Sequence, residues 1–172
     1  HRDVKPANVF LTRDGGVKLG DFGIARSAAR GNTVTGPGLV LGTPQFLAPE
    51  QITTGAATAQ SDQYAFGVLL YWLLTSEYPF SGDSVADLLA ASVKNSPRPL
   101  REWRPELPAA LESAVMRMVA RAPADRFASL AKAGAVLAQM EANPEPAATD
   151  ERRPRARPSK AARTVLAAPP PP

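Results

Sequence analysis

The sequence predicts a mainly α-helical domain with one short β-hairpin near its start, followed by a tail without regular structure. Three observations support this prediction. Two short apolar runs near the start flank a glycine-containing turn. Later segments repeat apolar residues at helical spacing, and this helical pattern stops near residue 140. Of the 172 residues, 44% are hydrophobic, which is enough for one packed core. We therefore divide the chain into a folded domain, residues 1–140, and a linker, residues 141–172.

The predicted hairpin consists of the runs Val9–Thr12 and Val17–Gly20. Residues 13–16, Arg-Asp-Gly-Gly, lie between them and have the composition of a tight turn. A hairpin brings its two ends together. Asn8, just before the first strand, is therefore expected to lie near Asp21, just after the second.

The middle of the chain is predicted to hold a loop and then two helical segments. Residues 27–43 are rich in Gly, Thr, Ala and Pro and have no steady period, which is typical of a loop. Pro49–Ile52 is expected to begin a short helical turn, and Ser61-Asp62 a longer helix. The run Tyr64–Leu74 is apolar on every side, so this helix should be central and buried.

Three amphipathic helices are expected to complete the domain. Ser84 is the predicted N-cap of the first, which should run to about Lys94. The apolar faces of the three helices consist, in order, of Val85, Leu88, Leu89 and Val93; of Leu111, Val115, Met118 and Val119; and of Phe127, Leu130, Ala133, Leu137 and Met140. From Glu141 onward the pattern stops. The tail contains 8 of the 18 prolines and too little apolar sequence to offset the entropy of ordering, so we expect it to be disordered.

Composition excludes several classes of function. The net charge is +4, but residues 1–140 contain 14 basic and 12 acidic side chains, which argues against a basic surface for nucleic acid. The chain has no cysteine and one histidine, so it has no disulfide, thiolate metal site or multi-histidine site. A reducing, cytoplasmic setting is compatible with this composition. No apolar run reaches the length of a membrane span.

Two carboxylates and one carboxamide are expected to meet at the base of the hairpin. The run His1–Asn8 reads HRDVKPAN, and Asp21 opens the run DFG. Phosphoryl transfer needs a group that accepts a hydroxyl proton and hard oxygen ligands for Mg²⁺. Asp3 is the candidate for the first role, and Asn8 and Asp21 are the candidates for the second.

These motifs resemble the catalytic loop and the metal-binding loop of the protein kinase superfamily, HRDxxxxN followed by DFG. Gly42–Glu50 resembles the end of a kinase activation segment, whose last three residues are Ala-Pro-Glu. Its sequence is most similar to that of bacterial receptor-type Ser/Thr kinases. The resemblance implies that residues 1–140 form the C-terminal lobe of the kinase fold. The N-terminal lobe, with its glycine-rich loop and ATP-orienting lysine, is absent from this chain.

The resemblance also implies roles for individual residues. Asp3 would be the catalytic base, and Lys5 would contact the transferred phosphate, a position at which lysine is typical of Ser/Thr specificity. Thr43 would bind the catalytic Asp and Lys and help to seat the substrate. Asn8 and Asp21 would bind ATP through Mg²⁺.

Three further residues resemble structural positions of the family. Asp62, at the start of the central helix, would hold the backbone of the catalytic loop. Arg126 would pair with Glu50, the carboxylate of Ala-Pro-Glu, through a bidentate contact.

Arg2, directly before Asp3, resembles the arginine of kinases that are regulated by phosphorylation of the activation loop. A phosphothreonine would supply negative charge for this arginine and order the loop. Thr33 and Thr35 are the candidate phosphorylation sites.

The expected function is that of a Ser/Thr protein kinase fragment, which transfers the γ-phosphate of ATP to Ser/Thr hydroxyls of protein substrates in signalling and uses ATP and Mg²⁺. Without the N-terminal lobe, this polypeptide alone should be inactive and poorly soluble. We expect a cytoplasmic kinase domain, tethered to a membrane only through a segment beyond Pro172, and no nucleic-acid partner.

Two alternatives stay open at this point. A pseudokinase or binding scaffold is the first, because the half that covers the nucleotide is missing. The second is an interaction module whose Arg/Pro tail binds a partner or an anionic membrane surface, although four acidic residues dilute its six basic ones.

Overall fold

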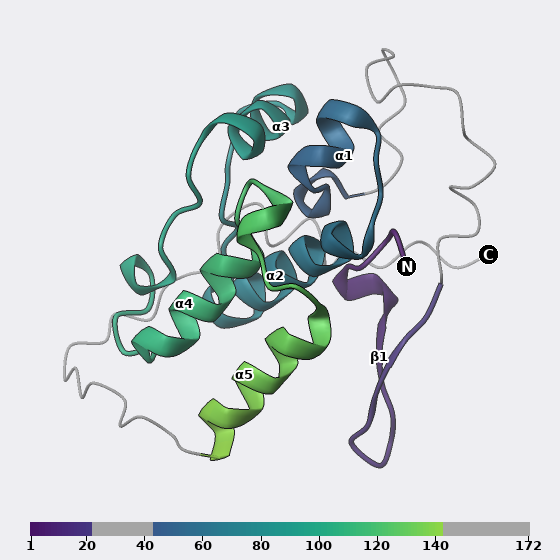
Figure 1. Ribbon diagram of the computed structural model, residues 1–172, viewed down its shortest axis with the longest axis vertical. Coiled ribbons are helices and arrows are strands. Elements are labelled where there is room, and N and C mark those ends of the chain that lie inside the picture. The colour runs from purple at the N-terminus through teal and green to yellow at the C-terminus, as the bar shows by residue number, and fades with distance from the viewer. Residues whose placement is uncertain (22–42, 143–172) are drawn as a thin grey trace.

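The computed structural model describes residues 1–21 and 43–142. This part of the chain is mainly helical and contains a two-stranded antiparallel sheet, which confirms the predicted class of a helical domain with a hairpin. Its α-helices are α1 (Pro49–Thr54), α2 (Ala59–Thr75), α3 (Val85–Lys94), α4 (Ala109–Met118) and α5 (Leu130–Ala142). Helix α2 crosses the middle, with α1 and α3 on one side and α5 and the hairpin on the other (Figure 1).

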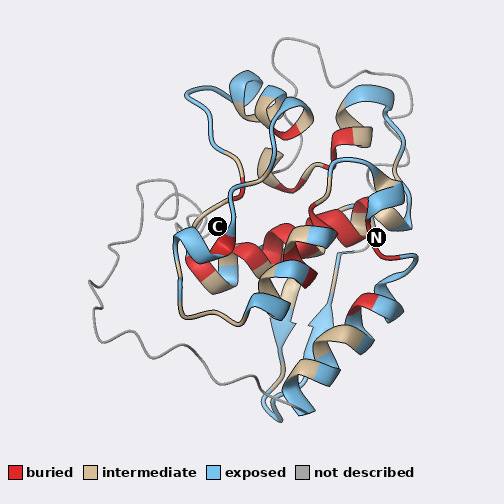
Figure 2. Ribbon diagram, turned by 60° about the vertical axis from the view of Figure 1, so that its left-hand side comes forward, coloured by how far each residue is buried: buried red, intermediate tan, exposed pale blue. Residues whose placement is uncertain are grey.

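The hairpin forms at the predicted place. Strands β1 (Val9–Leu11) and β2 (Val17–Leu19) are antiparallel, with Phe10 opposite Lys18. Gly15 lies in the turn with a φ of 82°, a left-handed conformation that glycine adopts without steric cost. The strands are largely exposed, in contrast to α2 (Figure 2).

Helix α2 begins two residues earlier than the sequence suggested. The Thr58 side chain caps the helix by accepting a hydrogen bond from the Gln60 amide, and the Ser61 hydroxyl accepts one from the Thr58 amide. Two hydroxyl side chains thus satisfy amides at the helix start, and Ser61 is its third residue. The prediction of complete burial is wrong at the far end, where Leu73 is 61% exposed.

The core lies where α2 meets α4. Tyr64, Val68, Val115 and Met118 are almost completely buried there. Gly67 makes the close approach possible, because a Cβ at this position would lie 2.7 Å from the Met118 Cβ. The two helices therefore meet at a distance that only glycine permits.

Helices α3 and α5 differ from the prediction in detail. Helix α3 has the expected bounds and the expected cap, since the Ser84 hydroxyl accepts a hydrogen bond from the Asp87 amide at 3.1 Å. Val85, expected on its buried face, is 40% exposed. Phe127 does not belong to the last helix, which begins at Leu130; it lies in the preceding loop, and its ring packs between α4 and α5.

Thr33 and Thr35, which lie in the predicted loop, and residues 143–172 of the predicted linker lie outside the described residues. Helix α5 continues to Ala142, past the boundary expected at Glu141. Within residues 1–21 and 43–142, no helix combines the length and the apolar character needed to cross a membrane.

Candidate active site

Asp3, Lys5 and Asn8 form one cluster at the start of the chain. The Asn8 amide nitrogen donates to the main-chain oxygen of Asp3 at 2.7 Å and to its Oδ2 at 3.0 Å. The Lys5 ammonium lies 2.8 Å from the same Oδ2. A single 3₁₀ turn, η1 (Pro6–Asn8), makes this possible by folding Asn8 back onto the preceding residues. The Asp3 carboxylate is thus held by an ammonium and by a buried carboxamide.

Asp62 holds the backbone just before this cluster. Its Oδ1 accepts a hydrogen bond from the Arg2 amide at 2.8 Å, and its Oδ2 accepts one from the His1 backbone nitrogen at 2.7 Å. Arg2 has a φ of 70°, a left-handed conformation that is strained for a residue with a side chain. The two bonds to Asp62 compensate for this strain, and they fix the loop to the first turn of α2.

The His1 ring is part of the site and was missed in the assignment of roles from the sequence. Its Nε2 lies 2.7 Å from the Gly20 carbonyl oxygen, and its Nδ1 accepts a hydrogen bond from the Asp3 amide at 3.3 Å. A carbonyl accepts and an amide donates, so these partners select the neutral tautomer with the proton on Nε2. The ring thereby joins the catalytic loop to the end of β2. Its position at the start of HRDxxxxN was the available signal.

Asp21 is the residue after Gly20, whose backbone amide binds the Asn8 carbonyl. The Gly20 amide donates to the Asn8 carbonyl at 2.9 Å, which extends the hairpin ladder and sets the next residue, Asp21, beside the end of the catalytic loop. Asp21 is exposed and has a φ of 52°. Asn8 and Asp21 are thus brought to the same end of the hairpin.

These two residues fit a magnesium site in their chemistry. The Asn8 nitrogen is committed to Asp3, which leaves the Oδ1 of that amide as its acceptor end. The Asp21 carboxylate is open to solvent. Mg²⁺ prefers one or two carboxylate or carbonyl oxygens together with phosphate oxygens and waters, and this pair supplies the protein share of such a set.

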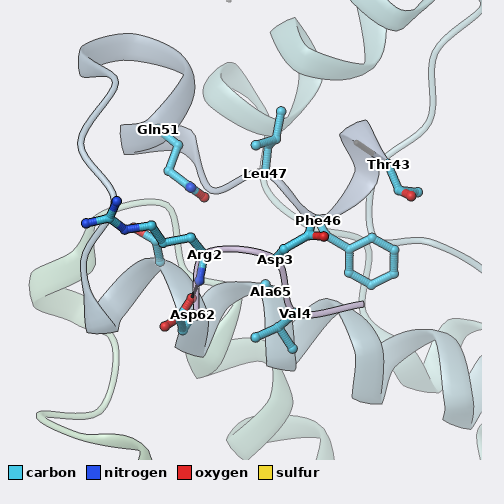
Figure 3. A pocket seen from close by; sticks show the side chains of 10 residues that line it. Arg2, Asp3, Val4, Thr43, Phe46, Leu47, Gln51, Asp62 and Ala65 are labelled. Atoms are coloured by element: carbon cyan, nitrogen blue, oxygen red, sulfur yellow. Dashed lines mark hydrogen bonds between the residues drawn. The ribbon is translucent and has the colours of Figure 1, made fainter. Parts of the chain in front are cut away.

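A pocket lies between the catalytic loop and the segment before α1. Its walls are formed by Arg2, Asp3, Val4, Thr43, Phe46, Leu47, Gln51, Ser61, Asp62 and Ala65. Figure 3 shows Asp3 near the middle of this lining, with Thr43 on one side and Asp62 on the other. Thr43 is therefore brought to the same pocket as Asp3.

Arg126 and Glu50 form a buried bidentate ion pair. Nη1 donates to Glu50 Oε1 and Nη2 to Glu50 Oε2, both at 2.8 Å. The remaining donors of the guanidinium bind the main-chain oxygens of Ala120, Gln60 and Arg121. Arg126 is 2% exposed, and each of its five N–H directions has an acceptor. The pair fixes the start of α1 to α2 and to the loop before α5.

The environment of the pair keeps Glu50 ionised. Burial alone would raise the pKa of the Glu50 carboxyl, but hydrogen bonds from Arg126, from its own backbone and from Ser61 outweigh this effect and hold the pKa below its ordinary value. The Tyr64 ring lies 5.0 Å from the Arg126 guanidinium, and burial raises the pKa of the Tyr64 hydroxyl. The pair is therefore a fixed charge contact at neutral pH.

Three polar side chains of the first turns of α2 complete this network and were missed in the sequence. The Ser61 hydroxyl donates to Glu50 Oε1 at 2.8 Å. The carboxamides of Gln60 and Gln63 both donate to the main-chain oxygen of Phe127. The available signal was Gln63, a polar residue just before the apolar run of α2, at a position that the helical period directs toward the core.

Comparison with known proteins gives a consistent picture. Residues 1–138 match the family model of the protein kinase domain. The chain is 41% identical over 147 residues to the serine/threonine-protein kinase PknB of Mycobacterium tuberculosis (strain ATCC 25618 / H37Rv), which covers 85% of this chain and 23% of PknB. It is 42% identical over 135 residues to the serine/threonine-protein kinase Pkn1 of Myxococcus xanthus, which covers 76% of this chain and 20% of Pkn1.

The chain thus spans less than a quarter of the length of these two curated relatives. The match nevertheless extends over nearly all of the described residues, including the catalytic-loop cluster, the pocket and the Glu50–Arg126 pair. The resemblance to bacterial Ser/Thr kinases is confirmed, and this chain belongs to the protein kinase domain family.

Proposed function

We propose that this chain is the C-terminal lobe of a Ser/Thr protein kinase, which transfers the γ-phosphate of ATP to Ser/Thr hydroxyls of protein substrates in signalling. The observation that supports this most strongly is the Asp3 carboxylate, held by Lys5 and Asn8 on a loop that Asp62 anchors. Because the chain spans less than a quarter of the length of these curated relatives, we assign this activity to a longer protein that contains the chain and an N-terminal lobe. We propose that its kinase domain lies in the cytoplasm, and we expect the 172-residue chain alone to be inactive.

Asp3 accepts the proton of the substrate hydroxyl. As that proton moves to the carboxylate, the hydroxyl oxygen forms a bond to the γ-phosphorus, the bond to the β-phosphate oxygen breaks, and ADP leaves. The donors Asn8 and Lys5 on Oδ2 hold the carboxylate in one orientation. A hydroxyl that approaches from the pocket side therefore meets a base of defined geometry.

Lys5 and Thr43 act beside this base. The Lys5 ammonium, 2.8 Å from Asp3, lies near enough to neutralise charge on a phosphate transferred at that carboxylate. Thr43 lines the same pocket and offers a hydroxyl for the substrate or the base. In the protein kinase family, a lysine at this position is typical of Ser/Thr specificity, which supports an aliphatic hydroxyl as the acceptor.

Asn8 and Asp21 hold the metal that accompanies the nucleotide. Mg²⁺ supplies positive charge that neutralises the phosphates during transfer. The support for this assignment is the pair of hard oxygens at one end of the hairpin. Thr33 and Thr35 are proposed sites of regulatory phosphorylation, which would act through Arg2.

The test is a comparison of two substitutions in the full-length protein that contains this chain. Asp3→Asn removes the base but not the metal ligands, so phosphate transfer to a protein substrate should fall by about 10³-fold or more while Mg·ATP affinity stays near the wild-type value. Asp21→Ala should instead weaken Mg·ATP binding. Transfer is measured with labelled ATP and phosphoamino-acid analysis, and binding by titration calorimetry.

Asp14→Asn is the matched control, because Asp14 lies in the exposed hairpin turn and should leave both quantities unchanged. Wild-type turnover in Asp3→Asn would contradict the assignment of the base. Wild-type protein that binds Mg·ATP but transfers no phosphate would show that this domain is a pseudokinase or scaffold.

A further inference from the structure

A buried glutamine on α2 binds the backbone of one residue of a distant loop at two points, its N–H and its C=O. The Gln63 Nε2 donates to the Phe127 carbonyl oxygen at 3.0 Å, and the Phe127 amide donates to the Gln63 Oε1 at 2.9 Å. Gln63 is 1% exposed, and both bonds are buried. A carboxamide is the one neutral side-chain group of this length that both donates and accepts in one plane.

The contact between Gln63 and Phe127 lies next to Arg126 in the chain. Phe127 directly follows Arg126, so the two hydrogen bonds fix the backbone at the point from which the arginine extends. Other contacts of the loop before α5 include the bond from Gln60 to the Phe127 oxygen and the bonds from the Arg126 side chain to the main-chain oxygens of Ala120 and Arg121. The Phe127 ring also packs between α4 and α5. The direction of the guanidinium toward Glu50 depends on this backbone.

We propose that Gln63 is a positioning residue, whose carboxamide holds the Phe127 backbone and so keeps the Arg126 guanidinium aligned with Glu50, at the end of the segment 43–50. This inference deepens the proposed kinase function and rests on it. Glu50 lies seven residues after Thr43, and the intervening residues Phe46 and Leu47 line the catalytic pocket. A shift of the Glu50 anchor therefore acts on Phe46 and Leu47 in the wall of the pocket. It does not act on Asn8 and Asp21, the proposed Mg²⁺ ligands, which lie at the end of the hairpin.

Gln60 provides a matched control three residues earlier in the same helix. Its Nε2 donates to the same Phe127 oxygen at 3.0 Å, but the Phe127 amide does not bind it, and its own Oε1 is buried with no hydrogen-bond partner in the described structure. Gln60→Met removes one of two bonds to an oxygen that stays satisfied. Gln63→Met removes both hydrogen bonds between Gln63 and the Phe127 backbone, which together we call the clamp.

The first measurement is hydrogen exchange of the Phe127 amide by NMR, in the full-length protein. The loss of a buried acceptor should accelerate its exchange about tenfold or more in Gln63→Met and leave it unchanged in Gln60→Met. This readout does not depend on catalysis. If the protein transfers no phosphate, the proposed function fails, whereas the clamp is still tested by exchange.

The second measurement separates positioning from general stability. Gln63→Met should raise KM for the protein substrate about tenfold with KM for ATP unchanged, and Gln60→Met should change neither. The effects of Gln63→Met and Glu50→Gln on substrate KM should be much less than multiplicative in the double variant, because both act through Arg126. Independent, multiplicative effects would overturn the proposal.

Gln63→Glu is the conservative variant and guards against a misfolded methionine variant. A protonated carboxyl keeps a donor and an acceptor for Phe127, whereas a carboxylate keeps only the acceptor. The charged groups around Phe127 are Arg126, which pairs with Glu50, and Arg117, whose guanidinium lies 4.4 Å from the centre of the Phe127 ring. Substrate KM of Gln63→Glu, relative to wild type at the same pH, should recover as pH falls from about 8 to about 6. Wild-type exchange and wild-type KM in both variants would disprove the clamp.

Discussion

Asp62 and Arg126 each bind main-chain atoms of segments that are distant in the sequence. Asp62 accepts from the backbone nitrogens of His1 and Arg2, and Arg126 donates to three carbonyl oxygens as well as to Glu50. Charged side chains used in this way satisfy backbone groups of irregular loops, which have no ladder of their own. The geometry of the proposed active site therefore depends on residues that do not contact substrate.

Removing the Glu50 carboxylate should destabilise the domain. Glu50→Ala leaves the guanidinium of Arg126 buried without its counter-charge, so the free energy of unfolding should fall by about 3 kcal/mol or more. Urea denaturation of the complete kinase domain measures this loss, and ATP affinity should change far less. An unfolding free energy equal to that of the wild type would show that the ion pair contributes nothing.

The same pair predicts a dependence of stability on pH. The folded-state pKa of Glu50 is lower than its ordinary value, so the pair stabilises the protein above that ordinary value and loses its contribution as pH falls through the folded-state pKa. The stability difference between wild type and Glu50→Gln should be largest near neutral pH and should shrink below about pH 4. Denaturation curves of both proteins across this range test the sign.

Helix α2 is the element that connects all parts of the site. Its first turns contain Ser61, Asp62 and Gln63, which contact α1, the catalytic loop and the loop before α5, respectively. Its middle packs against α4 at Gly67. Because one rigid helix carries these contacts, a displacement of α2 relative to α4 would move all of the anchors together.

Gly67→Ala should therefore destabilise the domain. The new methyl group would lie 2.7 Å from the Met118 Cβ, 2.9 Å from the Val119 Cγ1 and 3.3 Å from the Met118 carbonyl carbon. Forcing the helices apart should cost about 1–3 kcal/mol of unfolding free energy. Thermal or urea denaturation would reveal this change.

Gly134→Ala is the matched control for this substitution. Gly134 lies within α5, and a Cβ there meets no atom within 4 Å. Alanine is the better helix former, so this variant should gain about 0.5–1 kcal/mol. Equal effects of the two substitutions would mean that the contact between α2 and α4 is not tight.

At the scale of the whole molecule, the hairpin presents exposed apolar side chains to solvent. Leu11 is 79% exposed and Val17 is 67% exposed, and the two residues face each other directly across the strands. Phe10, on the opposite face of the hairpin, is 51% exposed. Contiguous apolar surface of this kind marks a contact site or a cause of aggregation.

The isolated 172-residue chain should consequently self-associate. Replacing Leu11 with lysine and Val17 with threonine should raise the concentration at which association begins about tenfold or more, since a buried leucine or valine contributes about 1.5–3 kcal/mol. Sedimentation velocity over a concentration series measures this. Leu73→Lys, which removes a 61% exposed leucine on α2, should have little effect. If all variants associate alike, the hairpin is not the responsible surface.

Local sequence predicted the elements better than their ends. The Arg-Asp-Gly-Gly turn predicted the hairpin, and Ser84 predicted the start of α3, because turn and cap chemistry involves neighbouring residues. The start of α2 was placed two residues late, although its cap by Thr58 is also local. Phe127 was assigned to the last helix because its spacing fits a helical period, whereas in the structure its ring fills a gap between α4 and α5.

The sequence by itself determined which chemical groups exist and in which order: carboxylates at Asp3, Asp21 and Glu50, a carboxamide at Asn8 and a guanidinium at Arg126. Only the tertiary structure decided that Gln63 binds the Phe127 backbone, 64 residues away, and that the His1 ring joins the Asp3 amide to Gly20. Chemical identity and short-range turns are properties of neighbouring residues. Contacts between distant segments depend on how α2 and α4 pack, and no local pattern encodes that distance.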